Sequence, residues 1–334
     1  MSSTLITGMG AALVDLFANV SDQQLQELGS AKASMSLIDA AQSVRLQAGV
    51  EVHSQRPGGS AANTVAGIAA LGQSAGFLGK TGDDALGQIF SDAFEALNVS
   101  FPVTPCDASQ HPTGHCLVLI TPDAERTMHT VLGASVMTAR DDMDGELLSR
   151  TGLLFSEGYV WDSPSARDGF LSAAQSVRAQ GGKVAFSLAD GFCVERHHAD
   201  FLALLDGQVD IVLANKVEAE ALFGCNDAAG LAAKMQGTDV LLSVTLGAEG
   251  ALIIDANGAR LVAAERVSDV VDLTGAGDQY AAGFLAALHN GVSPEKAAHI
   301  GHLAASEVIR HIGPRPQSDV RALLAKHGLD FIQN

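Results

Sequence analysis

A glycine-rich segment near the C-terminus combines residues that suit phosphoryl transfer. It reads Asp272-Leu-Thr-Gly-Ala-Gly-Asp278 and runs into a stretch whose apolar residues recur at helical spacing. The first N–H groups of a helix lack internal partners, so they form an anion site at the positive end of the helix dipole. We expect the amides of Gly275, Ala276 and Gly277 to stabilise a transferring phosphoryl group, and Asp278 to accept the proton of the attacking hydroxyl.

The same segment has a structural alternative. Asp is a favoured helix cap and Gly a favoured turn residue, so Gly-Ala-Gly-Asp278 could simply begin a helix. A carboxylate next to an anion site would repel a phosphate that is only bound. It suits an acid that takes up a proton while the amides receive the charge, and this favours the catalytic interpretation.

A second glycine-rich turn lies early in the chain, at Arg56-Pro-Gly-Gly-Ser-Ala-Ala-Asn63. Gly58 and Gly59 allow a ligand to lie against the backbone, and Asn63, one helical turn later, offers both a donor and an acceptor. The alternative is a tight loop in which Ser60 caps the following helix. We expect Gly58, Gly59 and Asn63 to bind substrate.

Asp15 follows the first predicted strand in Gly8-Met-Gly-Ala-Ala-Leu-Val-Asp15. Ligands of open α/β sheets bind at the carboxyl ends of strands, where a carboxylate can accept hydrogen bonds from a sugar diol. The alternative is a solvated loop residue. Gly8-Met-Gly10 is not a dinucleotide-binding motif, because Leu13 stands where the third glycine is required.

Composition restricts the class of protein. The 334 residues are 47% hydrophobic and 17% charged, which predicts a globular protein with one large core. A net charge of −18 disfavours nucleic acids and anionic membranes as partners. No apolar run reaches the roughly 18 residues that span a bilayer, and the N-terminus lacks the features of a signal peptide. Four scattered cysteines suit a reducing cytoplasm, where we expect the protein to act.

Apolar, β-branched runs alternate with Ala-rich helical stretches, which predicts an α/β fold with a doubly wound, mostly parallel sheet. The predicted strands are Leu5–Ile6, Gly76–Leu78, Leu153–Phe155, Lys183–Ser187, Ile211–Ala214, Val240–Thr245 and Ala251–Asp255, with a further strand end at Val267, Val270 and Val271. The predicted helices include Ser60–Leu71, Ala85–Ala96, Pro164–Gln180, Val217–Phe223, Ala228–Met235 and Pro294–Arg310. Residues 12–56 and 103–131 are more polar and predict antiparallel strands and loops. We interpret them as two insertions that form a small β-rich lid on a single domain, 1–334.

Together, Gly58-Gly59 with Asn63 and the segment Asp272–Asp278 resemble the two signatures of the PfkB, or ribokinase-like, carbohydrate kinases. The resemblance implies phosphorylation of a sugar or nucleoside hydroxyl by ATP, on a doubly wound domain with a β-rich lid. Asn215-Lys-Val-Glu218 resembles the family's NxxE element, which implies that Asn215 and Glu218 hold Mg²⁺, mainly through water. Thr245-Leu-Gly-Ala-Glu-Gly250 resembles its TxGxxG turn, which implies that Thr245, Gly247 and Gly250 contact the nucleotide.

Within this family, three stretches resemble the adenosine kinases more than the sugar kinases. They are Ser187–Cys193, Glu125–Met128 with Val131–Ala134, and Ala298–Ser306. The resemblance implies that Arg126 approaches with the lid to offset phosphate charge and that Asp15 and Asn63 bind sugar hydroxyls. Aromatic residues make up 5% of the chain, and Phe192 is our candidate for stacking on the base. Adenosine kinases of this type imply a monomer, with a lid-paired dimer as the alternative.

Three hypotheses follow for the function. The first is an ATP- and Mg²⁺-dependent nucleoside kinase that converts adenosine to AMP. The second is an ATP-dependent kinase of the same family that acts on ribose, fructose or a sugar acid. The third is a nucleoside- or sugar-binding protein without catalysis, which would have no need for an acid in the anion site. No protein partner is indicated.

Overall fold

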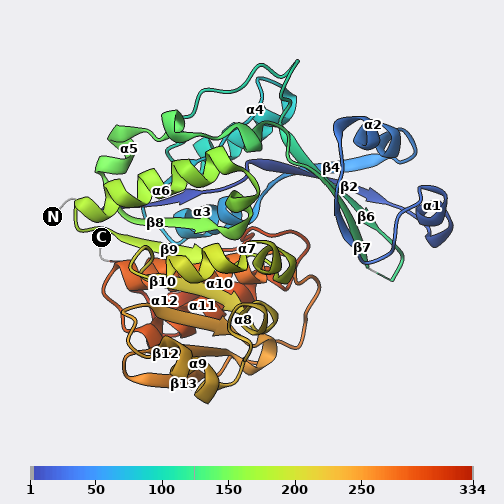
Figure 1. Ribbon diagram of the computed structural model, residues 1–334. Coiled ribbons are helices and arrows are strands. Elements are labelled where there is room, and N and C mark those ends of the chain that lie inside the picture. Colours follow the sequence, from blue (N-terminus) through green and yellow to red (C-terminus); the bar gives the residue numbers. More distant parts are fainter. Residues whose placement is uncertain (1–3, 124, 333–334) are drawn as a thin grey trace.

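The computed structural model describes residues 4–123 and 125–332 and consists of a large and a small β-sheet with flanking helices (Figure 1). The large sheet has eight strands in the order β13-β12-β11-β10-β9-β8-β1-β5. Their bounds are β1 Leu5–Met9, β5 Ala75–Leu78, β8 Thr151–Glu157, β9 Lys183–Ser187, β10 Ile211–Asn215, β11 Leu241–Thr245, β12 Ala251–Asp255 and β13 Gly258–Val262.

The large sheet is mostly parallel, as the sequence predicts. Strands β5, β1, β8, β9, β10 and β11 pair in parallel, and only β12 and β13 add an antiparallel hairpin at one edge of the described sheet. Each of the seven predicted strands is present, and β9 and β12 have the predicted bounds. The hairpin partner β13 was not predicted. Its Gly258-Ala-Arg-Leu-Val262 is short and half exposed, so it carries little apolar signal.

Helices cover both faces of the large sheet and bury two separate apolar clusters. One cluster is formed with α3 Ser60–Ala70, α4 Ala85–Ala96, α10 Ala276–His289, α11 Pro294–Val308 and α12 Val320–Lys326. The other is formed with α5 Gly145–Ser149, α6 Pro164–Ala179, α7 Gly191–Leu204, α8 Lys216–Phe223 and α9 Ala228–Met235. Short 3₁₀ turns are η1 Gly133–Met137, η2 Arg140–Asp142, η3 Gly158–Asp162 and η4 Gly247–Glu249. Across residues 4–123 and 125–332, no helix combines the length and the apolar content that crossing a bilayer requires.

The small sheet extends from one end of the molecule and is built from the two polar stretches (Figure 1). Its order is β3-β7-β6-β2-β4, with β2 Leu13–Asn19, β3 Met35–Leu37, β4 Val52–Gly58, β6 Gly114–Ile120 and β7 Arg126–Val131, accompanied by α1 Asp22–Glu27 and α2 Ala40–Ala48. The expectation of antiparallel strands is wrong in part, because β2 pairs with β6, and β3 with β7, in parallel. Strands β2 and β6 come from different insertions and leave the large sheet in the same direction, so they cannot form a hairpin.

The predicted strand end at Val267, Val270 and Val271 is also wrong. Residues 263–272 form neither helix nor strand, and the side chains of Val270 and Val271 are exposed. The backbone of this segment is held instead by the end of α11, because the amides of Val271 and Asp272 both donate to the Ile309 carbonyl. β-Branched residues favour a strand only where a partner strand is present.

The order of the strands creates a binding position at the carboxyl edge of the large sheet. From β1 the chain passes to β5 on one side and then returns to β8 on the other side of β1. Ligands of open α/β sheets bind where the strand order reverses in this way. The turns before α3 and α10, which carry the two glycine-rich motifs, lie beside this point, because α3 packs on β1 and α10 packs on α3.

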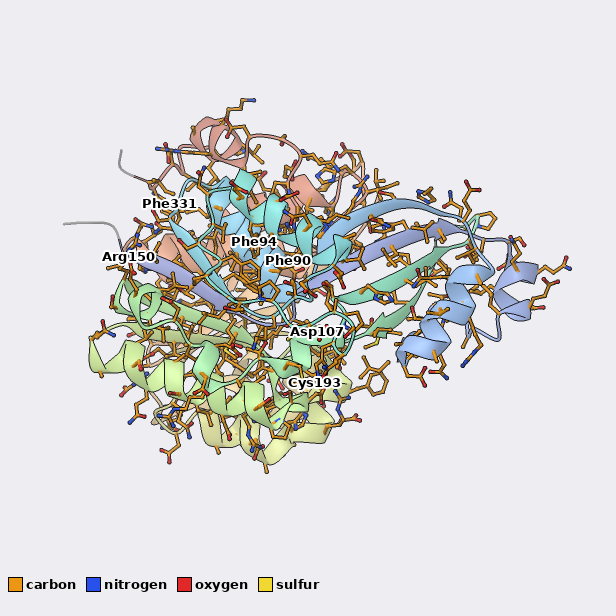
Figure 2. The ribbon with its side chains drawn as sticks, turned by 90° about the horizontal axis from the view of Figure 1, so that it is seen from above. Phe90, Phe94, Asp107, Arg150, Cys193 and Phe331 are labelled. Atoms are coloured by element: carbon orange, nitrogen blue, oxygen red, sulfur yellow. The ribbon has the colours of Figure 1, made fainter. Side chains whose placement is uncertain are left out.

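Four phenylalanine rings pack between α4 and the edge strand β5. Phe77, Phe90, Phe94 and Phe101 form ring contacts with centroids 4.8–5.9 Å apart. Figure 2 labels two of them, Phe90 and Phe94. We expect Phe90→Ala to lower the free energy of unfolding by about 3–5 kcal/mol, because it removes a fully buried ring and leaves a cavity. Denaturant titration measures this change. Phe192→Ala is the matched control, since Phe192 is 74% exposed, and an equal loss in both variants would contradict the prediction.

Candidate active site

Two helix N-termini meet at this edge of the large sheet. Helix α3 follows Gly59 and helix α10 follows Gly275, whose φ angles are +87° and +79°. A Cβ on Gly59 would lie 2.3 Å from the Ala11 carbonyl oxygen, and one on Gly275 would lie 2.5 Å from Pro314, so both positions require glycine. Neither N-cap makes a side-chain hydrogen bond to its helix. The positive end of the α10 dipole is therefore available to an anion, whereas the start of α3 is already occupied, because the Ala61 amide donates to the Glu157 carboxylate at 2.6 Å.

Asp278 lies in the first turn of α10 and is bound by two residues of α3. Its Oδ1 atom accepts a hydrogen bond from Ser60 Oγ at 2.7 Å, and Oδ2 accepts one from Asn63 Nδ2 at 3.1 Å. Burial raises the pKa of Asp278 to about 6, while these two hydrogen bonds and the Arg315 charge lower it. Because this pKa lies just below neutral pH, Asp278 is ionised there and can still accept a proton.

The amides expected to form the anion site differ in what they bind. The N–H of Ala276 donates to the Leu273 carbonyl oxygen at 3.2 Å, closing a tight turn. The N–H groups of Gly275 and Gly277 have no such partner within the described chain. The space beside Gly277 is open, since a Cβ built there would have no other atom within 4 Å.

Asp15 was expected directly after the first strand, at its carboxyl end, and this is wrong: it lies within β2 of the small sheet, opposite the glycine turn of β4. Strand pairing places Leu13 beside Gly58 and Asp15 beside Arg56. A Cβ on Gly58 would approach Asp15 Oδ2 to 2.6 Å, so glycine makes room for the carboxylate. Burial raises the pKa of Asp15 to about 7, and the charges of Arg315 and Arg126 oppose that rise.

Asn215 and Glu218 form a reciprocal cap at the start of α8. Asn215 Oδ1 accepts from the Glu218 amide at 2.9 Å, while Glu218 accepts from the Asn215 backbone and side-chain amides at 2.9 and 2.5 Å. Glu218 is buried, and burial raises its pKa to about 7. Both residues line a cavity of about 170 Å³ that Gly277 and Asp278 also line. The structure therefore brings the NxxE element and the acid of the glycine-rich segment into one space.

The predicted nucleotide turn lies next to this cavity. Thr245 ends β11, pairs with Asn215 and lines the same cavity. Gly247 begins the short turn η4 between β11 and β12, and Gly250 follows it. These two glycines are not among the residues that line the cavity, so the structure joins only Thr245 of this set to Asp278.

Arg126 does not contact the acid of α10. It lies on β7, where it forms an ion pair of 2.5 Å with Asp272 and a hydrogen bond with Thr274. Asp272 also accepts from the Gly313 and Thr274 amides, at 2.9 and 3.0 Å. Arg126 thus connects the small sheet to the turn that precedes α10.

Phe192 is not placed beside the other predicted residues. It lies near the start of α7, 74% exposed, and takes part in none of the ring contacts found in the described chain. A small apolar cluster, whose Phe17, Cys116 and Val118 side chains are buried, lies instead on the same face of the small sheet as Asp15. We call it the apolar patch, and it consists of Phe17, Cys116, Val118, Ile120 and Met128.

Two charged residues of the site were missed in the sequence. Glu157 ends β8 and accepts hydrogen bonds from the amides of Ala11 and Ala61, at 2.8 and 2.6 Å, which ties the β1 loop to the start of α3. Arg315 donates from Nε to Asn63 Oδ1 at 3.0 Å. A charged residue at the end of the buried run Leu153–Phe155 was a usable signal for Glu157. Arg315 stands in a polar loop after α11 and gave no comparable signal.

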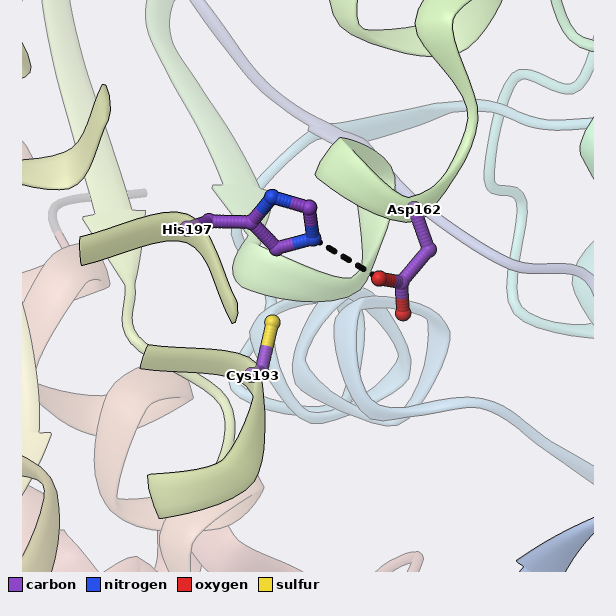
Figure 3. A group of neighbouring side chains, drawn as sticks. All are labelled: Asp162, Cys193 and His197. Atoms are coloured by element: carbon purple, nitrogen blue, oxygen red, sulfur yellow. Dashed lines mark hydrogen bonds and ion pairs between the residues drawn. The ribbon is translucent and has the colours of Figure 1, made fainter. Parts of the chain in front are cut away.

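A cluster of possible metal ligands, Asp162 on η3 with Cys193 and His197 on α7, has its carboxylate already bound by hydrogen bonds (Figure 3). His197 Nε2 lies 2.7 Å from Asp162 Oδ1, and Arg196 donates to both carboxylate oxygens of Asp162, at 3.1 and 2.7 Å. Burial raises the pKa of the Cys193 thiol to about 12. A guanidinium on the carboxylate and a protonated thiol both oppose a cation, so we interpret the cluster as a clamp between α7 and η3. All four cysteines are free thiols.

Comparison with known proteins agrees with this geometry. Adenosine kinase from Sinorhizobium meliloti superimposes with a TM-score of 0.89 and 38% identity, covering 98% of this chain and all of that one. A probable sugar kinase protein from Rhizobium etli CFN 42 gives a TM-score of 0.90 and 36% identity over the same shares. The aminoimidazole riboside kinase of Salmonella typhimurium is 30% identical over 69% of this chain and 72% of its own length.

The model of the pfkB family of carbohydrate kinases matches residues 28–321, a range that includes Asn63, the Asn215–Glu218 cap and Asp278. Such kinases transfer a phosphoryl group from ATP to a hydroxyl group. The two glycine-rich turns, the acid on α10 and the doubly wound sheet are the features that predicted this assignment. The chain belongs to the pfkB family of carbohydrate kinases and is an ATP-dependent kinase acting on an alcohol group.

Proposed function

We propose that this kinase phosphorylates the 5′-hydroxyl of a nucleoside, with adenosine as the preferred acceptor and AMP as the product. The observation that carries the kinase chemistry is the position of Asp278. It is held by Ser60 and Asn63 at the head of α10, in the cavity that the Asn215–Glu218 cap also lines. A proton acceptor, an anion site and a set of oxygen ligands are the parts that phosphoryl transfer requires.

Asp278 serves as the general base in this proposal. The acceptor oxygen forms a bond to the γ-phosphorus while the bond between that phosphorus and the β-γ bridging oxygen breaks, and ADP leaves. The proton of the acceptor hydroxyl passes to Asp278. Ser60 and Asn63 keep both carboxylate oxygens fixed, so the base does not have to reorient during the reaction.

The N–H groups of Gly275 and Gly277 stabilise the charge of the transferring group. The N–H of Ala276 can join them only if its bond to the Leu273 carbonyl opens. Asp272, Thr274 and Arg126 fix the turn in front of these amides. The anion site is thus assembled from backbone, and its shape depends on the contact between the small sheet and this turn.

The Asn215–Glu218 pair has the oxygen donors that suit Mg²⁺. Each of the two Glu218 oxygens already accepts one hydrogen bond from Asn215, which leaves lone pairs for metal-bound water. Mg²⁺ gives up its water reluctantly, so contact through water fits this pair. When bound, the ion neutralises charge on the β- and γ-phosphates. Thr245, Gly247 and Gly250 would contact the nucleotide on the same side.

The small sheet would act as the lid. It bears Asp15, and it contacts the rest of the protein through Arg126 on Asp272 and through Arg56, whose Nη1 donates to the Ile312 carbonyl at 3.0 Å. A lid in this position keeps water from competing with the acceptor hydroxyl. Asp15 and Asn63, with the backbone of Gly58 and Gly59, would hold the sugar hydroxyls.

The apolar patch supports a nucleoside over a free sugar. In the pairing of β2 with β6, Asp15 lies beside Cys116 and Phe17 beside Val118. The patch therefore shares a face of the small sheet with Asp15, the residue proposed to bind the ribose. Phe17, Cys116 and Val118 are only 3–7% exposed, so a base would reach them only if the small sheet moved. A flat heteroaromatic base would then gain free energy against these side chains, whereas the hydroxyls of a free sugar would lose hydrogen bonds to water. Phe192 could contribute to base binding only if α7 or the lid moved toward it.

A sugar kinase is the second candidate. The Rhizobium etli protein carries that description, and Asp15 and Asn63 would bind the hydroxyls of a pentose or hexose equally well. A coupled assay of ADP formation with adenosine, ribose and fructose in parallel separates the two. Turnover of adenosine well above both sugars is expected, and turnover of a sugar alone would overturn the nucleoside proposal.

The first prediction for the site concerns the base. Asp278→Asn preserves the size of the side chain but removes the proton acceptor, so kcat should fall by ~10²–10⁴-fold while ATP still binds. Steady-state kinetics and nucleotide titration measure the two effects. Asp168→Asn, at an exposed acid on α6, should keep the wild-type rate. More than a tenth of wild-type turnover in Asp278→Asn would contradict the assignment.

The second prediction concerns the sugar site. Asp15→Ala should weaken acceptor binding by about 1.5–3 kcal/mol, because it removes hydrogen bonds to a charged group, and should leave the KM for ATP unchanged. By the same reasoning, 2′-deoxyadenosine should be a poorer substrate than adenosine. Asp22→Ala, at an exposed acid of the same insertion, is the control. An unchanged acceptor KM in Asp15→Ala would show that the sugar binds elsewhere.

The third prediction concerns the metal. Glu218→Gln should raise the Mg²⁺ concentration needed for half-maximal activity and lower kcat, since the neutral amide holds metal-bound water less well. The KM for the acceptor should stay the same. Glu220→Gln on the exposed side of α8 is the matched control. If both variants gave the wild-type Mg²⁺ titration, Glu218 would be only a helix cap.

A further inference from the structure

Arg315 reaches the site from the loop that follows α11, and several contacts fix its position. Its Nε donates to Asn63 Oδ1 at 3.0 Å, and its guanidinium carbon lies 5.5 Å from the centre of the Phe94 ring. The adjacent Pro314 carbonyl accepts a hydrogen bond from Gln279 at 2.9 Å, and Gln279 also donates to the Asn63 carbonyl at 3.1 Å. Helices α3 and α10 thus hold this loop from both sides.

The bond from Arg315 determines which way the Asn63 side chain faces. An amide can donate only from its nitrogen and accept only through its oxygen, whereas a guanidinium only donates. Asn63 must therefore turn Oδ1 toward Arg315, and Nδ2 then points at Asp278, to which it donates at 3.1 Å. Without Arg315 the amide could rotate and present its oxygen to the carboxylate, which would be repulsive.

Arg315 is also the cation among the acids of the site. Its charge opposes the burial that raises the pKa values of Asp15 and Asp278 to about 7 and about 6. Asp278 in turn raises the pKa of Glu157, which burial brings to about 7. Arg126 acts on Asp15 from the small sheet but is paired with Asp272. The two acids therefore share the Arg315 guanidinium.

Packing alone does not account for an arginine at this position. Its Nη2 atom is buried and has no hydrogen-bond partner in the part of the chain that the structure describes. A buried donor without an acceptor is destabilising by about 1–3 kcal/mol. A residue selected only for stability would avoid this cost, so the arginine is not explained by packing.

We propose that Arg315 is a positioning residue for catalysis, which orients Asn63 toward the general base Asp278 and keeps that base ionised. This inference rests on the proposed role of Asp278 and deepens it. Nothing in the glycine-rich motifs assigns a role to the loop after α11. The proposal makes the Ser60, Asn63, Asp278 and Arg315 side chains one hydrogen-bonded unit, with the guanidinium as its only cation among the described residues.

The test is the pH dependence of kcat at saturating acceptor and ATP, which reports groups in the bound complex and excludes the effect of Asp15 on binding. Arg315→Gln should move the acidic limb about one pH unit upward, because a lost cation raises the pKa of the carboxyl that must be ionised. At pH values below the acidic limbs of both enzymes, this shift gives the variant a roughly tenfold lower kcat than the wild type. The difference in kcat should become smaller at alkaline pH. Arg310→Gln, at an exposed arginine paired with Asp269, is the matched control.

Arg315→Lys separates charge from orientation and serves if Arg315→Gln does not fold, which thermal unfolding would reveal. It keeps the cation but lacks the fixed planar donor, so the acidic limb should stay in place while kcat falls severalfold at every pH. An unshifted limb in a folded Arg315→Gln variant, or wild-type kcat in Arg315→Lys, would overturn the inference. Substantial activity in Asp278→Asn would instead overturn the proposed function, so the two failures are distinguishable.

Discussion

The proposed function depends on one electrostatic constraint, which is that the Asp278 carboxylate must stay ionised in a half-buried site that also receives a polyanion. Asp278 meets it with two hydrogen bonds from α3, the dipole of α10 and the charge of Arg315. Each contribution comes from a different segment, so the packing of α3 against α10 has to be close. Gly67 on α3 allows that approach, because a Cβ there would lie 2.1 Å from Gln279 Oε1 and 2.7 Å from Ala282 Cβ on α10.

The sequence predicted the large sheet well because each buried parallel strand is a continuous apolar run bounded by turns. Strands β9 and β12 and helices α4 and α9 have the predicted bounds. The strand predictions are wrong where the structure of a segment depends on which strand lies beside it. Val267, Val270 and Val271 have strand propensity but no strand beside them, and β2 and β6 pair in parallel because they belong to different insertions.

The candidate site could be predicted where its chemistry is local in sequence. The segment Asp272–Asp278 and the Asn215–Glu218 cap each contain their own turn, helix start and candidate functional side chain. Glu157 and Arg315 were missed because their partners lie 96 to 252 residues away, at Ala61 and Asn63. Arg126 was recognised, but its ion pair with Asp272 could not be anticipated, because it depends on how the small sheet meets the turn before α10.

The contact between Asn63 and Arg315 has a consequence for how the chain folds. Its two residues are separated by 252 positions, and Ser60 and Asp278 by 218. Contacts at such separation form late, because the entropy of closing long loops is lost before they stabilise the chain. During synthesis, the first glycine-rich turn leaves the ribosome long before α10 exists, and the Ala-rich face of α3 then lacks the helix that covers it. We therefore expect the nascent chain to rely on chaperones until its final segment is released.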